Sequence, residues 1–195
     1  MRGLEQIPSL YDGLMWVLDG LGLGDWRLQL VRGAAGRTLE VGCGTGRNLP
    51  LYSSTTQVIG LDPDHAALAR ARRRSPAVQL VVGTVETLPF RAGAFDTVVS
   101  SLVFCSVDDP IQGLREIRRV LRSGGDLRML EHVRARRPAW AALQDFLQPV
   151  WTRVTGGCRP NRDTEAAVER AGFRIDVTDR VSMRVLRRFS ARPLD

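Results

Sequence analysis

The sequence predicts an α/β protein in which a mostly parallel sheet carries helices on both faces. Short runs rich in β-branched residues alternate with helical segments, and a glycine-rich turn at 42–46 follows the first of these runs. Strands separated by helices usually pair in parallel, and the helices then cover both sides of the sheet. The length of 195 residues suits one domain, and no repeat, low-complexity tract or linker divides it. We therefore expect residues 1–195 to form a single domain.

The individual elements follow from hydrophobic periodicity and from turn residues. Apolar stripes at helical spacing indicate two helices at the start, and runs of strand length follow. Asp64 is suited to cap the helix after it, and Ser123-Gly124-Gly125 is expected to separate a helix from the next strand. The predicted helices are 9–20, 24–35, 65–74, 110–122, 140–151 and 161–171. The predicted strands are 37–42, 57–62, 78–82, 95–100, 126–133, 173–181 and 186–192.

Composition points away from nucleic acid and from a membrane span. The formal net charge is +7, and all 28 basic residues are arginine. The arginines occur on nearly every predicted helix, and no aromatic residues alternate with them as on a base-stacking surface. No apolar stretch reaches the roughly 20 residues of a membrane-spanning helix, and the N-terminus shows no secretory signal pattern. We expect a cytoplasmic protein with no nucleic-acid partner, and its oligomeric state is open.

The cysteines and histidines do not predict a metal site. Cys43, Cys105 and Cys158 are odd in number and far apart, and none belongs to a Cys-x-x-Cys pair. His65 and His132 are 67 positions apart. Neither a disulfide framework nor a zinc cluster is indicated by such spacing.

The glycine-rich turn is the main sign of a nucleotide-like cofactor. Glycines at 42, 44 and 46 let the backbone turn sharply and approach a ligand closely. The dinucleotide fingerprint Gly-x-Gly-x-x-Gly fails, because its third glycine falls on Arg47 when counted from Gly42. Asp62 ends the second predicted strand, where a carboxylate can accept two hydrogen bonds from a ribose diol. Its alternative role as a helix cap is less favoured, since Asp64 is available for that.

Several motifs together resemble the class I S-adenosylmethionine-dependent methyltransferases. They occur in consistent order between residues 37 and 132, and they are Leu39–Gly46, Asp62, Gly83–Phe90 and Phe95–Ser100. The resemblance implies a Rossmann-like, seven-stranded, mostly parallel sheet with helices on both faces and an antiparallel last strand. It also implies that S-adenosylmethionine is the cofactor.

The resemblance assigns residues to each part of that cofactor. The end of the first strand and the glycine loop would hold the methionine part, the acid after the second strand the ribose, and the turn after the third strand the adenine. Many members of the family have an acid where this sequence has Thr84, so the contact to the adenine amine is open. The residues implied are Glu40, Gly42, Gly44 and Gly46 for methionine, Asp62 for ribose, Val85 and Glu86 for adenine, and Ser101 at the methionine end, with Cys43, Asn48 and Pro63 as further cofactor-binding residues.

A second set of motifs is similar to the thiol (alkyl) S-methyltransferase branch. It consists of Ser101–Val107, Glu131–Val133, Gln144–Trp151, Gly157-Cys158 and Glu169–Ala171. Members of that branch carry a hydrophobic anchor ahead of the fold, and this sequence is not expected to have one. The branch implies a small, apolar thiol as the acceptor. The alternatives are a quinol or phenol C- or O-methyltransferase, which shares the first set of motifs, and a non-catalytic protein that binds the cofactor.

The acceptor side is predicted from position in the sequence. A thiol needs little help from a base, whereas a phenol or alcohol needs a histidine or carboxylate within reach. His132 ends a predicted strand and is the candidate general base, with a packed or hydrogen-bonded histidine as the equal alternative. Tyr11, Cys105 and Trp151 are expected near the acceptor. Residues 1–36 are expected to form a helical lid, and residues 138–158 an insertion whose aromatic side chains are mostly core.

Overall fold

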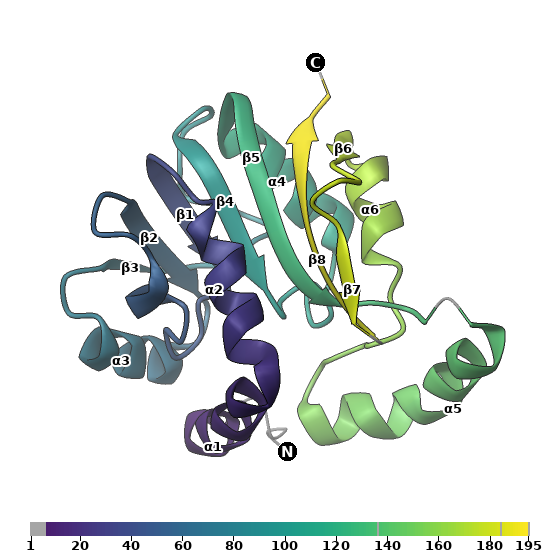
Figure 1. Cartoon of the computed structure of the whole chain (residues 1–195). Helices are drawn as coiled ribbons and strands as arrows, with labels where there is room; N and C mark the ends of the chain where they lie inside the picture. The colour runs from purple at the N-terminus through teal and green to yellow at the C-terminus, as the bar shows by residue number, and fades with distance from the viewer. Residues whose placement is uncertain (1–6, 136, 184, 195) are drawn as a thin grey trace.

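The computed structural model describes residues 7–135, 137–183 and 185–194, and it is an α/β sandwich around one mixed sheet (Figure 1). The sheet has eight strands, seven of them in the order β3-β2-β1-β4-β5-β8-β6, and β7 pairs with β8 off this path. Strands β1 to β5 are mutually parallel, while β8 is antiparallel to each of its neighbours. The predicted Rossmann-like sheet with a reversed strand is confirmed, with one strand more than seven.

The strands are β1 (Arg37–Val41), β2 (Gln57–Asp62), β3 (Gln79–Val82), β4 (Phe95–Ser101), β5 (Leu121–His132), β6 (Phe173–Ile175), β7 (Val181–Met183) and β8 (Leu186–Pro193). The helices are α1 (Pro8–Leu18), α2 (Gly24–Arg32), α3 (His65–Arg74), α4 (Pro110–Val120), α5 (Pro138–Thr155) and α6 (Thr164–Arg170). A π-helical turn, Asp19–Leu23, joins α1 to α2, and a short 3-10 turn, Leu49–Leu51, follows the glycine loop.

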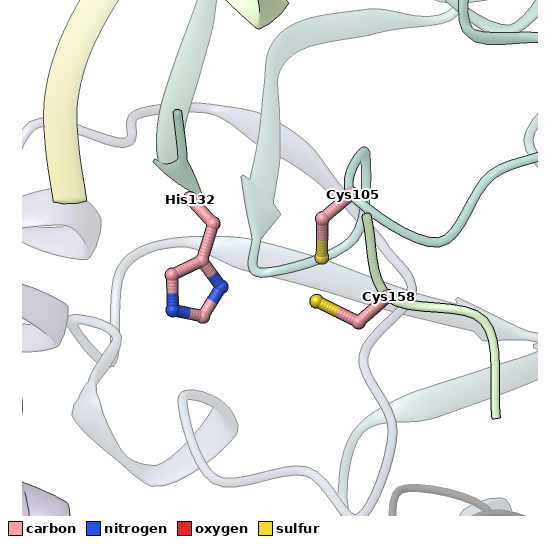
Figure 2. A group of neighbouring side chains, drawn as sticks. All are labelled: Cys105, His132 and Cys158. Carbon is pink, nitrogen blue, oxygen red and sulfur yellow. The ribbon is translucent and has the colours of Figure 1, made fainter. Parts of the chain in front are cut away.

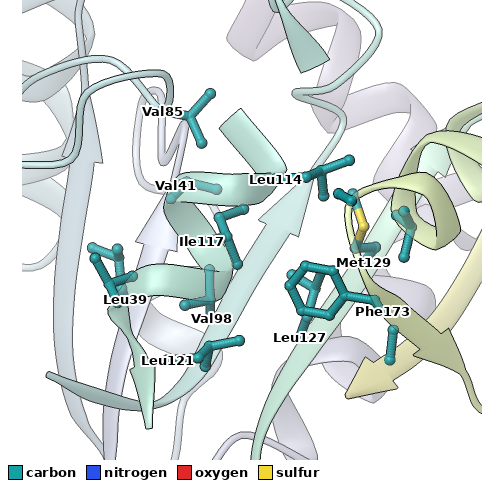
Figure 3. Close-up of a cluster of buried hydrophobic side chains, with 14 of the residues drawn as sticks. Leu39, Val41, Val85, Val98, Leu114, Ile117, Leu121, Leu127, Met129 and Phe173 are labelled. Carbon is teal, nitrogen blue, oxygen red and sulfur yellow. The ribbon is translucent and has the colours of Figure 1, made fainter. Parts of the chain in front are cut away.

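The core lies on both faces of the sheet. On one face, α4 and α6 cover side chains of the central strands, and Figure 3 shows Ile117 and Leu114 of α4 above Val98 and Met129. On the other face, α2 packs Leu30 against Val99 and Leu130. Helix α3 packs on the same face near the sheet edge. Burial of apolar side chains on both faces is typical of a sheet whose central strands are parallel.

Two sequence predictions about the middle of the chain were wrong. The strand expected at 126–133 begins at Leu121, so Ser123-Gly124-Gly125 lies inside β5 and does not end the helix. Helix α4 ends because Leu121 already has extended backbone angles. The irregular start of β5 pairs with β4 through a register shift between Phe95 and Thr97. A glycine with positive φ at 124 is therefore part of a bulged strand.

Helix α5 also differs from expectation. Its periodic apolar residues were predicted to be mostly core, but Trp140 is 58% exposed and Phe146 78% exposed. Figure 1 shows α5 projecting below the sheet, at the same edge as α1. The helix lacks a covering layer, so amphipathic periodicity alone did not lead to burial. Within the described residues, helices long and apolar enough to cross a bilayer are absent.

Candidate cofactor and acceptor site

The carboxyl ends of β1, β2, β4 and β5 meet at one edge of the sheet, where parallel strands place ligand sites. The glycine loop leaves β1 there. Gly42, Gly44 and Gly46 all have positive φ, and a side chain at Gly46 would overlap Ala71 of α3. A side chain at Gly44 would instead meet nothing within 4 Å. The loop thus presents bare backbone at Gly44 to an open space, while Gly46 lets α3 approach.

Glu40 is a buried carboxylate with one unmatched oxygen. Its Oε1 accepts a hydrogen bond from Asn48 Nδ2 at 3.0 Å. Its Oε2 has no partner of hydrogen-bonding geometry among the described residues, although the Tyr52 hydroxyl lies near enough to lower the pKa of Glu40. Burial outweighs this effect and raises the pKa of Glu40 to about 7. An ammonium group delivered by a ligand would satisfy the free oxygen.

Asp62 is held in place by two backbone donors. Gly44 N donates to Oδ2 at 2.8 Å, and Asp64 N donates to Oδ1 at 2.9 Å. Asp64 caps α3 by accepting from Ala66 N, so Asp62 does not serve as the cap. Burial raises the pKa of Asp62. Each carboxylate oxygen keeps a further lone pair, which makes the group suited to a diol.

Asp62 and Gly44 line a cavity of about 370 Å³, and Glu40 lines a small pocket beside it that shares Gly42 and Gly44 with that cavity. Pro63 and Thr84 belong to its wall together with Val85, which is buried, and Glu86. Glu86 also accepts a hydrogen bond from Asp108 N at 3.3 Å. From α1, Tyr11 and Pro8 also line the cavity. Of the segments predicted to form a lid, only α1 contributes residues to the cavity wall, whereas α2 packs on the sheet and Trp16 is exposed.

A buried arginine that the sequence did not single out orients the polar side chains beside Glu40. Arg27 of α2 donates from Nη1 to Asn48 Oδ1 at 3.0 Å and to Ser101 Oγ at 3.2 Å. Its Nε donates to Asp19 Oδ1 at 3.0 Å. Asn48 and Ser101 are thus oriented by one guanidinium, and Asn48 in turn orients Glu40. No local pattern distinguishes Arg27 from the other arginines, so only the fold reveals it.

Ion pairs fasten α1 and the turn after it to the glycine loop. Arg47 donates to Asp19 Oδ2 at 2.5 Å and pairs with Asp12 at 3.4 Å. Thr45 Oγ1 donates to Asp12 Oδ1 at 2.7 Å, and Arg74 of α3 reaches the same carboxylate at 3.3 Å. Arg47, which stands where the dinucleotide fingerprint requires its third glycine, thus links α1 to the glycine loop.

The segment that follows β4 lines the cavity as well. Glu131 is buried and accepts hydrogen bonds from Ser100 Oγ at 2.7 Å, Val103 N at 3.0 Å and Phe104 N at 3.1 Å. Burial raises its pKa to about 7, and these donors partly offset the rise. Leu102 has a φ of 59°, a strained angle for a residue with a side chain. Glu131 therefore positions this segment and faces away from His132, as strand alternation predicts.

The structure brings together three residues that the sequence spacing kept apart. Ligand atoms of Cys105, His132 and Cys158 all lie within 4.8 Å of one another. Figure 2 shows the His132 imidazole at the end of β5 turned toward both sulfur atoms. Trp151 lies beside Cys158 and lowers the pKa of that thiol, and its place on exposed α5 keeps it out of the cavity wall. The spacing of the cysteines along the chain gave no sign that Cys105 and Cys158 lie close together.

Cys43 is different from the other two cysteines. Its side chain packs beneath the loop with Leu49, Leu68 and Ala71. Burial raises its pKa well above the usual range. Only its backbone remains for the cofactor contact that the resemblance implied.

Comparisons with known proteins agree with this geometry. Residues 39–129 match the family model described as a methyltransferase domain. Residues 39–129 thus carry a methyltransferase domain, and the chain as a whole is similar to S-adenosylmethionine-dependent methyltransferases. It is 38% identical to human thiol S-methyltransferase TMT1B over 72% of this chain and 62% of that protein, and 37% identical to human TMT1A over 75% and 64%. The chain thus spans less than two thirds of the length of these curated relatives.

Solved structures of methyltransferases have a similar fold. A SAM-dependent methyltransferase from Thermotoga maritima superposes with a TM-score of 0.66 at 23% identity, covering 85% of this chain and 86% of that one. The residues at the carboxyl edge fit the cofactor of the family: Glu40 offers an unmatched carboxylate oxygen, Gly44 an open approach, and Asp62 an oriented carboxylate.

Proposed function

We propose that this protein transfers the methyl group of S-adenosylmethionine to a small, apolar thiol. The observation that carries the proposal is the arrangement at the carboxyl edge, where Asp62 lines the main cavity and Glu40 lines a small pocket that shares the glycine loop with it. The identity of 37–38% to two thiol S-methyltransferases supports a thiol as the acceptor.

The residues of the chain would act mainly by positioning the cofactor and the acceptor. When bound, the cofactor supplies a methyl group that its sulfonium already activates. Glu40 would hold the ammonium of the methionine part, and Asp62 would hold the ribose hydroxyls. Val85 and Glu86 would enclose the adenine, with Thr84 as a further hydrogen-bonding group at the wall. Fixing both reactants in line and excluding water lowers the barrier without a further catalytic group.

The acceptor would enter from the side of Leu102 and Ser106, which belong to the cavity wall. A thiol with a pKa near 8.5 is a few per cent thiolate at neutral pH, so it reacts without a strong base. The general-base role of His132 is needed for a phenol or quinol acceptor. The same site would then act as a C- or O-methyltransferase, and a protein that only binds the cofactor is the remaining alternative.

A panel of acceptors tests the proposal. The protein is incubated with methyl-labelled S-adenosylmethionine and with alkane thiols, phenols, quinols and amines of similar size. We expect label in the thioether of the thiols, at a rate at least about tenfold above that for the phenols, since the thiol is the stronger nucleophile near neutral pH. Label only in a phenol or quinol would replace the thiol with the alternative acceptor. Cofactor binding without label in any product would overturn methyl transfer itself.

A further inference from the structure

Cys105, His132 and Cys158 form a group of neighbouring side chains beside the cofactor cavity. Cys105 follows β4, His132 ends β5, and Cys158 follows α5, so three separate segments deliver one side chain each. Their ligand atoms lie within 4.8 Å of one another. Cys105 and Cys158 are 2% and 0% exposed, and both are free thiols. Figure 2 shows both sulfur atoms and the imidazole directed toward a common space.

The backbone around each of these residues is well fixed. Arg159 N donates to Cys105 O at 2.8 Å, which ties the segment of Cys158 to that of Cys105. Thr152 Oγ1 donates to Cys158 O at 2.9 Å. Two glycines with positive φ, 156 and 157, turn the chain sharply between α5 and Cys158. His132 is held by the pairing of β5 with β8, opposite Leu186. The site is therefore built by the fold and does not depend on mobile side chains.

Two thiols and an imidazole are the donor set of a zinc site. Tetrahedral zinc has Zn–S bonds of about 2.3 Å and Zn–N bonds of about 2.0–2.1 Å, so its ligand atoms lie roughly 3.4–3.8 Å apart. The separations at this site need at most a small contraction to reach that range. Soft sulfur ligands disfavour magnesium and calcium, which prefer oxygen.

We propose that Cys105, His132 and Cys158 bind a zinc ion whose fourth position is open to the acceptor thiol. Zinc with three protein ligands and one open position is the arrangement found in catalytic sites. The ion would lie at the wall of the cofactor cavity, because Cys105 Sγ is 3.7 Å from Leu102 O and 3.6 Å from Ser106 Oγ, and both residues line that cavity. His132 is then a metal ligand and not a general base.

This proposal rests on the proposed thiol methyl transfer and adds a step to it. The acceptor thiol loses its proton to solvent as its sulfur binds the zinc. The bound sulfur then forms a bond to the methyl carbon, and the bond between that carbon and the sulfonium breaks. The products are S-adenosylhomocysteine and a thioether, and the thioether leaves because it is a weak zinc ligand. The zinc changes neither its charge nor its oxidation state.

Metal content is the first test, and it does not depend on activity. The full chain is expressed with added zinc, purified with a phosphine reductant, and assayed by mass spectrometry for metals. We expect about one zinc per chain, as for a site with three protein ligands. Two variants, the double variant C105S/C158S and the single variant H132A, should each lose the zinc. C43A and H65A are the matched controls, because Cys43 packs beneath the loop and His65 starts α3, and both should keep the metal. Equal zinc content in the wild type and in C105S/C158S would overturn the site.

Cobalt substitution is the second test, and it uses the intact wild-type protein. We expect thiolate-to-cobalt charge-transfer bands together with visible bands typical of four-coordinate cobalt. A small alkane thiol should shift the visible bands by entering the open position. A cobalt spectrum that does not respond to the thiol would overturn the open position. A protein that methylates thiols but binds no metal would overturn the zinc site alone and leave the proposed function standing.

Discussion

At the scale of single residues, we expect Glu40 to couple cofactor binding to pH. Burial raises its pKa from 4.5 to about 7, and Oε2 lacks a hydrogen-bond partner among the described residues. An ammonium next to this carboxylate favours the ionised form, so binding should release a proton near pH 7. We expect the affinity for S-adenosylmethionine to rise between pH 6 and pH 8, by up to about tenfold per pH unit below the pKa. Calorimetry in buffers of different ionisation enthalpy measures both the affinity and the proton release.

The matched variant for this prediction is E40Q, which has a similar shape and no titratable group. Its affinity should be lower than that of the wild type at pH 8, and its pH dependence should lack the step near pH 7. The same raised pKa has the opposite effect on the ligand-free protein. In that protein, the contribution of Glu40 to the free energy of unfolding is complete below pH 4.5 and is lost as the pH rises through about 7. A wild-type affinity that is equal at pH 6 and pH 8 would contradict the role assigned to Glu40.

At the scale of elements, the ion pairs of Arg47 decide whether α1 stays over the cavity. Arg47 joins the glycine loop to Asp12 on α1 and to Asp19 in the turn after it. Replacing Arg47 with methionine removes the charge and keeps most of the apolar chain. We expect affinity for the cofactor to fall by about tenfold, in line with the loss of partly buried, charge-assisted hydrogen bonds. Calorimetry with R47M and with the control R91M, at an exposed position outside the site, measures the effect.

A second prediction at this scale concerns how much β8 and α5 each contribute to stability. Phe189 of β8 is 1% exposed, whereas Phe146 of α5 is 78% exposed. Removing a buried phenylalanine leaves a cavity and costs about 3–5 kcal/mol, while an exposed position changes stability by less than about 0.5 kcal/mol. Urea unfolding of F189A and F146A should therefore show a large loss of stability for the first only. A comparable loss in F146A would mean that another surface covers α5 in solution.

At the scale of the whole molecule, local signals predicted most of the sheet but only part of the site. Strand β2 ends at Asp62 as expected, because a β-branched run and a capping aspartate at 64 are read from adjacent residues. The glycine loop was also predicted from adjacent residues. Arg27 and the group of Cys105 with Cys158 were not predicted, because their contacts join residues more than 20 positions apart. The exposed face of α5 was missed because periodicity shows that a helix has an apolar side but not what covers it.

The central claim is that the edge cavity binds S-adenosylmethionine through Asp62 and Glu40, and calorimetric binding of its demethylated product tests this most directly. S-adenosylhomocysteine keeps the ribose and the ammonium and cannot react, so its affinity reports the site alone. We expect it to bind the wild type with NAD silent, and D62A to weaken binding by roughly 10- to 150-fold, the cost of losing hydrogen bonds to a charged, buried group. Unchanged affinity in D62A, or binding of NAD in its place, would contradict the assignment.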